Sequence, residues 1–109
     1  MSEPFEQHVA YCVAACNDCS TDCGDCLAHM LGQSSPNSCP ACCVECIVIC
    51  RLTADAIARH SPFAKQYAAL CAEVCDWCAK ECSEHEMDHC QRCAAACRRC
   101  ADACRAMLA

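Results

Sequence analysis

The fold is decided by the stretch CQRCAAACRRCADAC, residues 90–104. Its five cysteines are separated by steps of three, four, three and four residues. Alternating steps of three and four place side chains on one face of an α-helix. The alanines at 94–96 strengthen the helical signal, because alanine is the best helix former. The spacing therefore predicts an amphipathic helix whose inward face is made of cysteine.

Three further stretches carry the same spacing. They are CVAACNDCSTDCGDC at 12–26, CPACCVECIVIC at 39–50 and CAEVCDWCAKEC at 71–82. In the second of these, Cys42 is an extra neighbour of Cys43, and we expect only one of these adjacent thiols to lie fully on the cysteine face. Four repeats of the pattern predict four helices. We place them near residues 4–31, 38–59, 62–83 and 84–108.

Cap residues precede three of the predicted helices. Ser38 and Ser61 each stand shortly before a proline, which is typical of an N-cap followed by a proline in the first turn. Ser83–Glu86 fits a capping box. Because the connections are short, the four helices are expected to run up, down, up and down. The sequence thus predicts an all-α antiparallel four-helix bundle with a cysteine-lined core, forming one domain over residues 1–109.

Composition explains what fills that bundle and excludes several partners. The 109 residues include 19 cysteines but few leucines, isoleucines, valines and phenylalanines, so cysteine must form the core. A net charge of -6 argues against nucleic acid, and no apolar run approaches the roughly 20 residues of a membrane span. Residues 1–7 lack the basic and apolar regions of an export signal. We therefore expect a cytoplasmic protein whose thiols stay reduced.

So many thiols on helical faces indicate metal binding. Cysteines four residues apart on a helix have Cβ atoms about 5–6 Å apart, whereas a disulfide needs about 3.8 Å. Two sulfurs on one linear ion lie about 4–5 Å apart, twice a metal–thiolate bond. Soft thiolates select Cu(I), zinc or iron–sulfur clusters. The iron–sulfur run of cysteines is absent, and structural zinc commonly takes its four ligands from loops.

Cu(I) is the ion that this pattern favours. Buried thiolates need neutralising, and about one bridged Cu(I) per cysteine would do so. Such a capacity indicates storage and not catalysis, and no catalytic grouping of side chains stands out. A zinc or cadmium buffer resembling metallothionein is one alternative, and a thiol redox sensor built on a C-x-x-C pair is another. The predicted ligands are Cys12, Cys16, Cys19, Cys23, Cys26, Cys39, Cys42, Cys43, Cys46, Cys50, Cys71, Cys75, Cys78, Cys82, Cys90, Cys93, Cys97, Cys100 and Cys104.

The two ends of the predicted bundle differ in chemistry. One end gathers imidazole and thioether groups, which are exchangeable ligands for Cu(I), and we call it the mouth. Its candidate metal-uptake residues are His29, Met30, His85, Met87 and His89. The other end is predicted to be a hydrophobic plug. Its residues are Phe5, Val9, Leu52, Ile57, Phe63, Tyr67, Leu70, Met107 and Leu108.

With its four cysteine clusters, its CxxxC pairs and no export signal, the chain resembles the cytosolic copper storage proteins. The resemblance extends from about Tyr11 to Cys104. It implies many Cu(I) ions held by thiolates inside each bundle, and it implies that bundles associate into homotetramers. Val44, Ile47 and Val48 extend the apolar surface of the second predicted helix and hint at an interface there. A copper chaperone is a further candidate partner.

Overall fold

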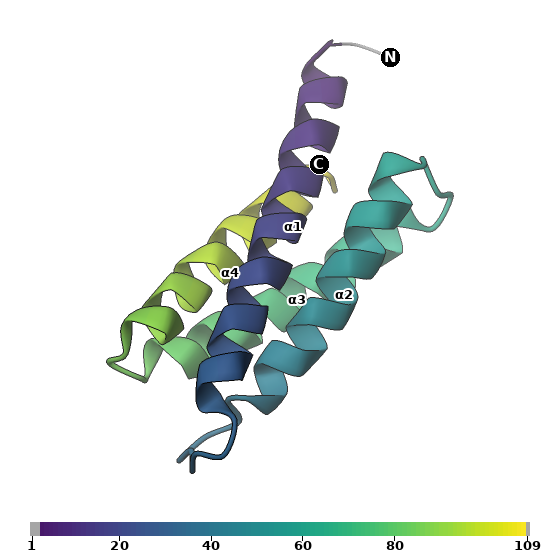
Figure 1. The fold of residues 1–109 in the computed structure, drawn as a ribbon. Coiled ribbons are helices and arrows are strands. Elements are labelled where there is room, and N and C mark those ends of the chain that lie inside the picture. The colour runs from purple at the N-terminus through teal and green to yellow at the C-terminus, as the bar shows by residue number, and fades with distance from the viewer. Residues whose placement is uncertain (1–2, 109) are drawn as a thin grey trace.

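The computed structural model describes the backbone of residues 3–108 and the side chains of residues 6–108. Within that part of the chain it contains four α-helices and no strand. Figure 1 labels them as α1 (Glu3–Met30), α2 (Ala41–Ala58), α3 (Ala64–Ser83) and α4 (Asp88–Ala106). The predicted all-α fold is confirmed.

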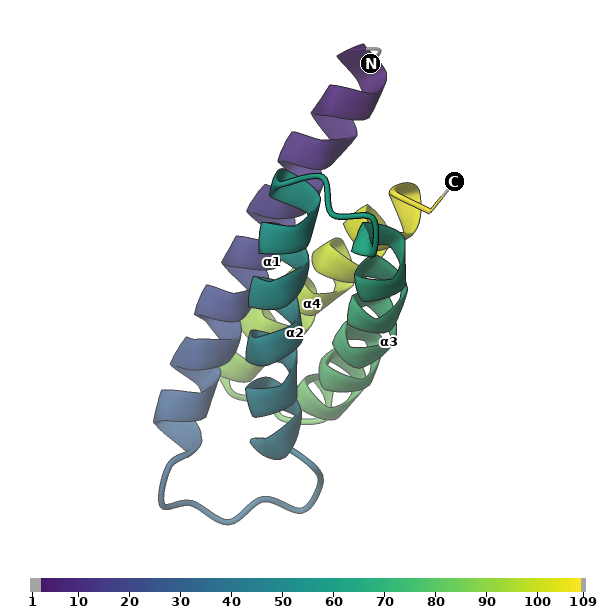
Figure 2. The same ribbon diagram turned by 90° about the vertical axis from the view of Figure 1, so that its right-hand side faces the viewer.

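The helices form an antiparallel bundle. Helix α1 packs against α2 and α4, and α3 packs against the same two helices. Within the described residues, the backbones of diagonally opposite helices stay apart, and α2 reaches α4 through cysteine side chains in the core. The described chain measures 47 × 19 × 18 Å, and the first turns of α1 project beyond the other helices (Figure 2). None of the helices found between residues 3 and 108 is both long and apolar enough to cross a membrane.

Cysteine and alanine make up nearly all of the core. All 19 cysteines are 0% exposed. Buried alanines such as Ala68, Ala94 and Ala101 lie beside them. Cys42 and Cys43 are both completely buried, and Cys43 Sγ lies 3.9 Å from Cys82 Sγ and from Cys93 Sγ. That only one of the pair lies fully on the cysteine face stays a prediction. Successive residues of a helix are about 100° apart, so two neighbours can both face the interior when helices pack on either side.

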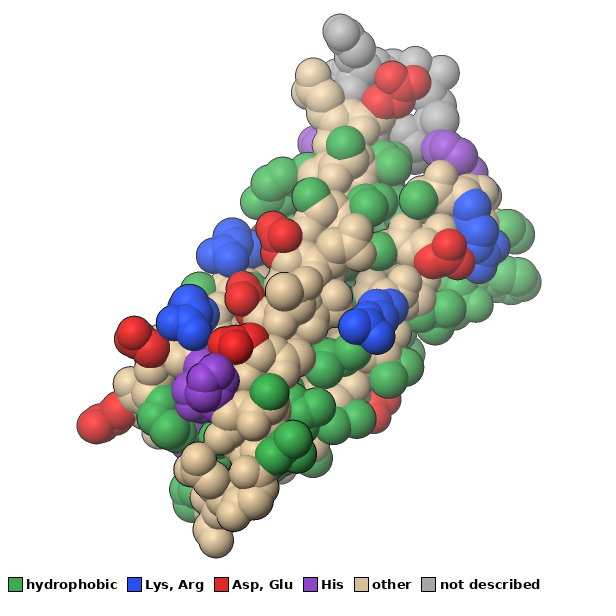
Figure 3. Space-filling model, viewed as in Figure 1, with side chains coloured by type: hydrophobic (Ala, Val, Ile, Leu, Met, Phe, Trp, Pro, Cys, Tyr) green, Lys and Arg blue, Asp and Glu red, His purple; other side chains and the backbone are tan. Residues whose placement is uncertain are grey.

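Charged side chains cover the outside of the bundle. Figure 3 shows acidic and basic groups interspersed on one face. Among the side chains that the structure describes, two ion pairs join different helices: Arg92 of α4 lies 3.2 Å from Asp25 of α1, and Arg105 of α4 pairs with Asp76 of α3. These groups are about half exposed, so each pair is worth at most about 1 kcal/mol. The bundle is held together by its interior.

Helix α2 begins three residues later than predicted, because Ser38 does not cap it. The Ser38 carbonyl accepts a hydrogen bond from the Cys42 N–H at 3.0 Å, and the N-cap residue is Pro40, whose side chain offers no capping bond. The polar side chain that orders this turn is Asn37, whose Oδ1 accepts from the Cys39 N–H at 3.1 Å. Cys39 therefore lies in the loop ahead of the helix.

The starts of α3 and α4 also differ from the prediction. The Ser61 hydroxyl accepts from the Phe63 N–H at 3.1 Å, but this bond closes a turn before α3 begins at Ala64. The capping box at 83–86 was wrong, because the Ser83 hydroxyl donates to the Lys80 carbonyl at 2.8 Å inside α3. Helix α4 begins at Asp88 after the extended residue Met87. The far ends of α1, α2 and α4 fall one or two residues short of the predicted ones.

Candidate metal centre

The cysteine sulfurs form a continuous column along the bundle axis. At its centre, Cys46 Sγ of α2 lies 3.5 Å from Cys19 of α1, 3.6 Å from Cys75 of α3 and 3.8 Å from Cys97 of α4. Cys46 Sγ also lies 3.8 Å from Cys50, its neighbour one turn along α2. One sulfur therefore contacts thiols from all four helices. A soft cation placed among these thiols would link the helices.

Overlapping groups of four sulfurs run along this column. In each group the four sulfurs lie within 4.8 Å of one another, and neighbouring groups share members such as Cys23. Five such groups are Cys16, Cys71, Cys100 and Cys104; Cys19, Cys46, Cys50 and Cys75; Cys19, Cys23, Cys46 and Cys97; Cys23, Cys78, Cys93 and Cys97; and Cys26, Cys39, Cys43 and Cys82. Sharing of sulfurs between groups suits bridged ions better than separate four-ligand sites.

Burial sets the protonation of these thiols. It raises the pKa of Cys39 and of Cys90 to about 12, because a thiolate loses its hydration there. Hydrogen bonds from the Cys43 and Cys82 thiols lower the pKa of Cys26 to about 6. A low-dielectric core cannot hold thiolates throughout the column. Many of the thiols therefore keep their protons until a cation displaces them.

Protonated thiols pack as small hydrophobic groups, so the metal-free protein is expected to be helical at neutral pH. The raised pKa values of Cys39 and Cys90 mean that the folded state holds these protons more tightly than the unfolded chain, whose thiols titrate near 9.0. The resulting stability is fully present below pH 9 and is lost as the pH rises to 12.

Circular dichroism melts of the reduced protein at pH 7.5, 9 and 10.5 check this expectation. We expect a helical spectrum at pH 7.5 and a falling Tm above pH 9. A variant with alanine at positions 39 and 90 should lose less of its Tm over that range. A coil spectrum at pH 7.5, or the same alkaline loss in parent and variant, would contradict the account.

Two of the residues predicted at the mouth, His29 and His89, lie together beside the end of the sulfur column. His89 Nδ1 is 3.4 Å from Cys26 Sγ and 3.4 Å from Cys90 Sγ, so its imidazole borders the last sulfurs of the column. The ring of His29 stacks on that of His89 with centroids 4.5 Å apart. His29 is exposed to solvent and His89 is half-buried. The stacked rings therefore lie between solvent and the last thiols of the column.

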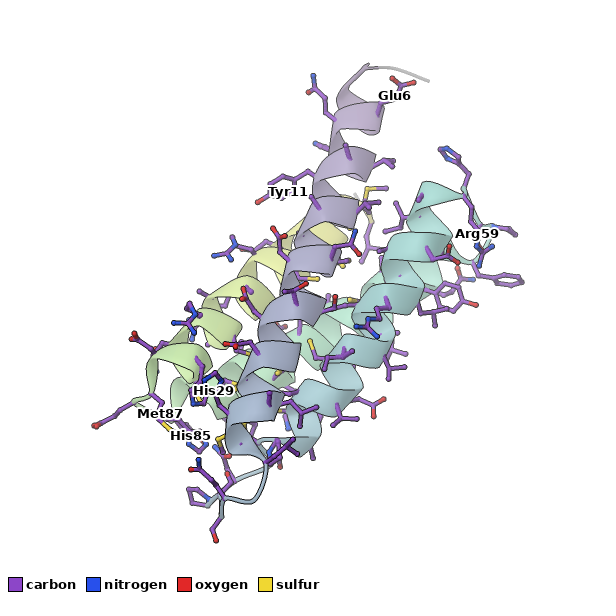
Figure 4. The ribbon with its side chains drawn as sticks, viewed as in Figure 1. Glu6, Tyr11, His29, Arg59, His85 and Met87 are labelled. Carbon is purple, nitrogen blue, oxygen red and sulfur yellow. The ribbon has the colours of Figure 1, made fainter. Side chains whose placement is uncertain are left out.

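The other predicted mouth residues, His85, Met87 and Met30, differ in how deeply they are buried. Figure 4 shows His29, His85 and Met87 at the same end of the bundle. His85 is half-buried, with Nε2 3.0 Å from Asn37 Oδ1, and Met87 is 39% exposed. Met30 is 2% exposed and packs in the core. Asn37 was not among the predicted residues. Its bond to Cys39 is local, but its other partners, His85 among them, lie too far away in the sequence for a local pattern to reveal them.

The plug predicted at the opposite end was only partly right. Ile57 is buried, but Phe63 and Leu70 are 57% and 50% exposed. Phe63 precedes α3, in the turn closed by Ser61, and so stays outside the core. A pocket of about 280 Å³ opens among Val9, Ile57 and Met107. The side chain of Phe5, also predicted in the plug, lies outside the described residues.

A four-helix bundle whose core is an unbroken column of free thiols defines a thiolate metal-binding protein. The family model described as copper storage protein matches residues 5–109. This chain therefore belongs to the copper storage protein family.

Solved structures of the family share the fold. The chain is 41% identical to a Cu(I)-bound copper storage protein, BsCsp3, with a TM-score of 0.85 over 94% of this chain and 99% of that one. An apo-Csp3 from Bacillus subtilis gives 41% identity and a TM-score of 0.81, over 92% of this chain and 98% of that one. A cytosolic copper storage protein from Streptomyces lividans, loaded with five coppers, is 30% identical with a TM-score of 0.89, over 98% of this chain and 97% of that one.

A shorter match connects the chain to the cysteine-rich protein YhjQ of Bacillus subtilis (strain 168). The two are 49% identical over 45 residues, which is 41% of this chain and 42% of that protein. This match spans less than half of either protein, so the full-length likeness rests on the solved structures.

Proposed function

We propose that the protein stores Cu(I) in the cytosol, with the cysteine thiolates as ligands. The observation that carries this proposal is the sulfur column, in which overlapping groups of four thiols, all fully buried, link the four helices. Thiolates are soft ligands that favour Cu(I). Support also comes from the relatives, since one is Cu(I)-bound and another is a cytosolic protein loaded with copper.

The proposed ligands are the 19 cysteines predicted from the sequence. If each ion takes two sulfurs and each sulfur bridges two ions, the capacity is about one Cu(I) per cysteine. Each monovalent ion then replaces about one thiol proton, so that the filled core carries little net charge. A closed column without an exposed coordination position suits sequestration, in keeping with the storage role of the family.

Anaerobic loading of the reduced protein with excess Cu(I), followed by desalting and elemental analysis, tests this function. We expect the copper to stay with the protein at about one ion per cysteine. Copper that is lost on desalting, or retained at only a few ions per chain, would overturn the proposal.

The mouth is proposed as the route of copper uptake, because His89 contacts two terminal sulfurs and His85 lies in the adjoining connection. Replacing His85 and His89 together by alanine should slow Cu(I) uptake by about tenfold, the scale on which residues around a metal site act, while lowering the capacity much less. Stopped-flow mixing with a Cu(I)–chelator complex measures the rate. A His8→Ala/His60→Ala variant serves as the matched control, because these histidines belong to the other end. Equal uptake rates in all three proteins would contradict the assignment.

Two partner proposals accompany the storage function. The homotetramer rests on the family resemblance, and exposed apolar side chains on α2 support it, since Val44 and Val48 are 47% and 60% exposed. A copper chaperone is proposed as the donor or acceptor of the ions, because a buried store of a reactive cation needs a carrier at its mouth.

A further inference from the structure

The loop between α1 and α2 is tied to the connection between α3 and α4 by one side chain, Asn37. Its Nδ2 donates to the Glu81 carbonyl at 2.9 Å and to Glu84 Oε1 at 2.9 Å. Its Oδ1 accepts from His85 Nε2 at 3.0 Å. All three partners are more than 40 residues away in the sequence. These bonds join the two loops that close the mouth of the bundle.

The same amide group also holds Cys39. Asn37 Oδ1 accepts from the Cys39 N–H at 3.1 Å. Cys39 is unusual among the 19 cysteines, because the other 18 lie within helices and it precedes α2. Its sulfur is nevertheless fully buried and belongs to the thiol group of Cys26, Cys43 and Cys82. Its Sγ lies 4.0 Å from Cys43 and 3.9 Å from Cys82.

A helix fixes a side chain through its backbone hydrogen bonds, but a loop residue needs another anchor. For Cys39 that anchor is Asn37, whose own position depends on Glu81, Glu84 and His85. Backbone bonds hold the flanking residues, since Ser38 accepts from the Cys42 N–H and Pro40 accepts from the Cys43 N–H. The N–H of Cys39 itself is held by the Asn37 side chain, so loss of the cross-loop bonds loosens Cys39 directly. The population of such locally opened states governs how fast a buried group exchanges with solvent.

We propose that Asn37 is a positioning residue that holds Cys39 in the last thiol group and keeps the mouth closed. It thereby limits the rate at which Cu(I) leaves the column at this end. The effect on the rate of Cu(I) release rests on the proposed storage function, whereas the placement of Cys39 can be tested without copper.

The copper-free test measures alkylation of individual cysteines in the reduced apo protein. Iodoacetamide is added at neutral pH, and mass spectrometry follows the modification of Cys39 and of the central Cys46. In Asn37→Ala we expect Cys39 to react about tenfold faster than in the parent, as follows from losing one or two ordinary hydrogen bonds in a local opening. Cys46 should react at the parent rate in all variants.

Three further variants separate positioning from a general loss of structure. Gln33→Ala is the matched control, because Gln33 lies in the same loop but its amide bonds only the His29 carbonyl of α1. Asn37→Asp keeps the oxygen acceptor for Cys39 but turns a carboxylate toward Glu84, so it should open the loop as Asn37→Ala does. Adding Glu84→Gln to Asn37→Asp supplies an amide donor to the new carboxylate. This double variant should recover a large part of the parent protection.

The copper test follows removal of Cu(I) from loaded protein by excess chelator. We expect Asn37→Ala to release its first ions about tenfold faster than the parent and Gln33→Ala, with nearly the same total capacity. Alkylation and release rates in Asn37→Ala equal to those in Gln33→Ala would overturn the proposal. The proposal would also be overturned if Cys39 were alkylated as fast in the Asn37→Asp/Glu84→Gln double variant as in Asn37→Asp. The two proposals can fail separately. If the parent did not retain copper but Cys39 still reacted faster in Asn37→Ala, the storage function would be wrong and the positioning role of Asn37 would be supported.

Discussion

Mild oxidation of the reduced, metal-free protein is expected to remove most of its capacity for Cu(I). Sulfurs from different helices lie close together: Cys23 and Cys93 are 3.4 Å apart, and Cys26 and Cys90 are 3.6 Å apart. A disulfide requires an approach of about 1.5 Å more, which side-chain rotation and a small helix shift can supply. A disulfide sulfur is no longer a thiolate ligand, and each cross-link would also stiffen the column.

Treatment with diamide before anaerobic Cu(I) loading measures this effect. The oxidised protein should bind only a few ions, and reduction followed by removal of the reductant should restore the full capacity. A thiol assay on the same samples reports how many cysteines have been consumed. Full copper capacity in protein without free thiols would show that the sulfurs are not the ligands.

Removing three central thiols should lower the copper capacity more than removing three terminal ones. Cys19, Cys46 and Cys97 lie 3.5 to 3.8 Å from one another at the centre of the column. If each sulfur bridges two ions, replacing these three by alanine breaks links on both sides of the gap and costs about four to six ions, because neighbouring sulfurs share ions. Alanine suits a helix, so the bundle itself should still form.

The matched variant replaces Cys12, Cys39 and Cys90, which lie toward the ends of the column, and should cost about three ions. Elemental analysis after anaerobic loading gives both capacities, and circular dichroism checks that both variants are helical. An equal loss of ions in the two variants would contradict bridging. If the sulfurs did not share ions, each removed thiol would cost the same number of ions at the centre and at the ends of the column.

The helices and their inward faces could be predicted from the sequence because cysteine spacing is a local signal. Steps of three and four residues identify one face of a helix without reference to its neighbours. The antiparallel order of the helices predicted that His29 and His89 would lie at one end of the bundle, and the structure stacks their rings there. Which cysteines bind copper remains a prediction.

Helix starts were harder to predict because they depend on contacts between distant segments. Ser38 has the residue type of a cap, yet Asn37 orders the turn instead, held by Glu81 and Glu84, which lie more than 40 residues away in the sequence. The prediction of a hydrophobic plug was only partly right for a similar reason. An apolar residue such as Phe63 is expected to be buried, but its burial depends on where α3 begins. Because α3 begins at Ala64, Phe63 lies before the helix and is exposed.

A competition titration tests the central claim most directly. The fully reduced protein is titrated anaerobically with Cu(I), and in parallel with Zn(II), against a chelator that binds each ion tightly. We predict uptake of about one Cu(I) per cysteine, with zinc bound more weakly and at fewer sites. Saturation at a few Cu(I) ions, or a preference for zinc, would contradict copper storage and favour a zinc buffer or a redox role for the thiol column.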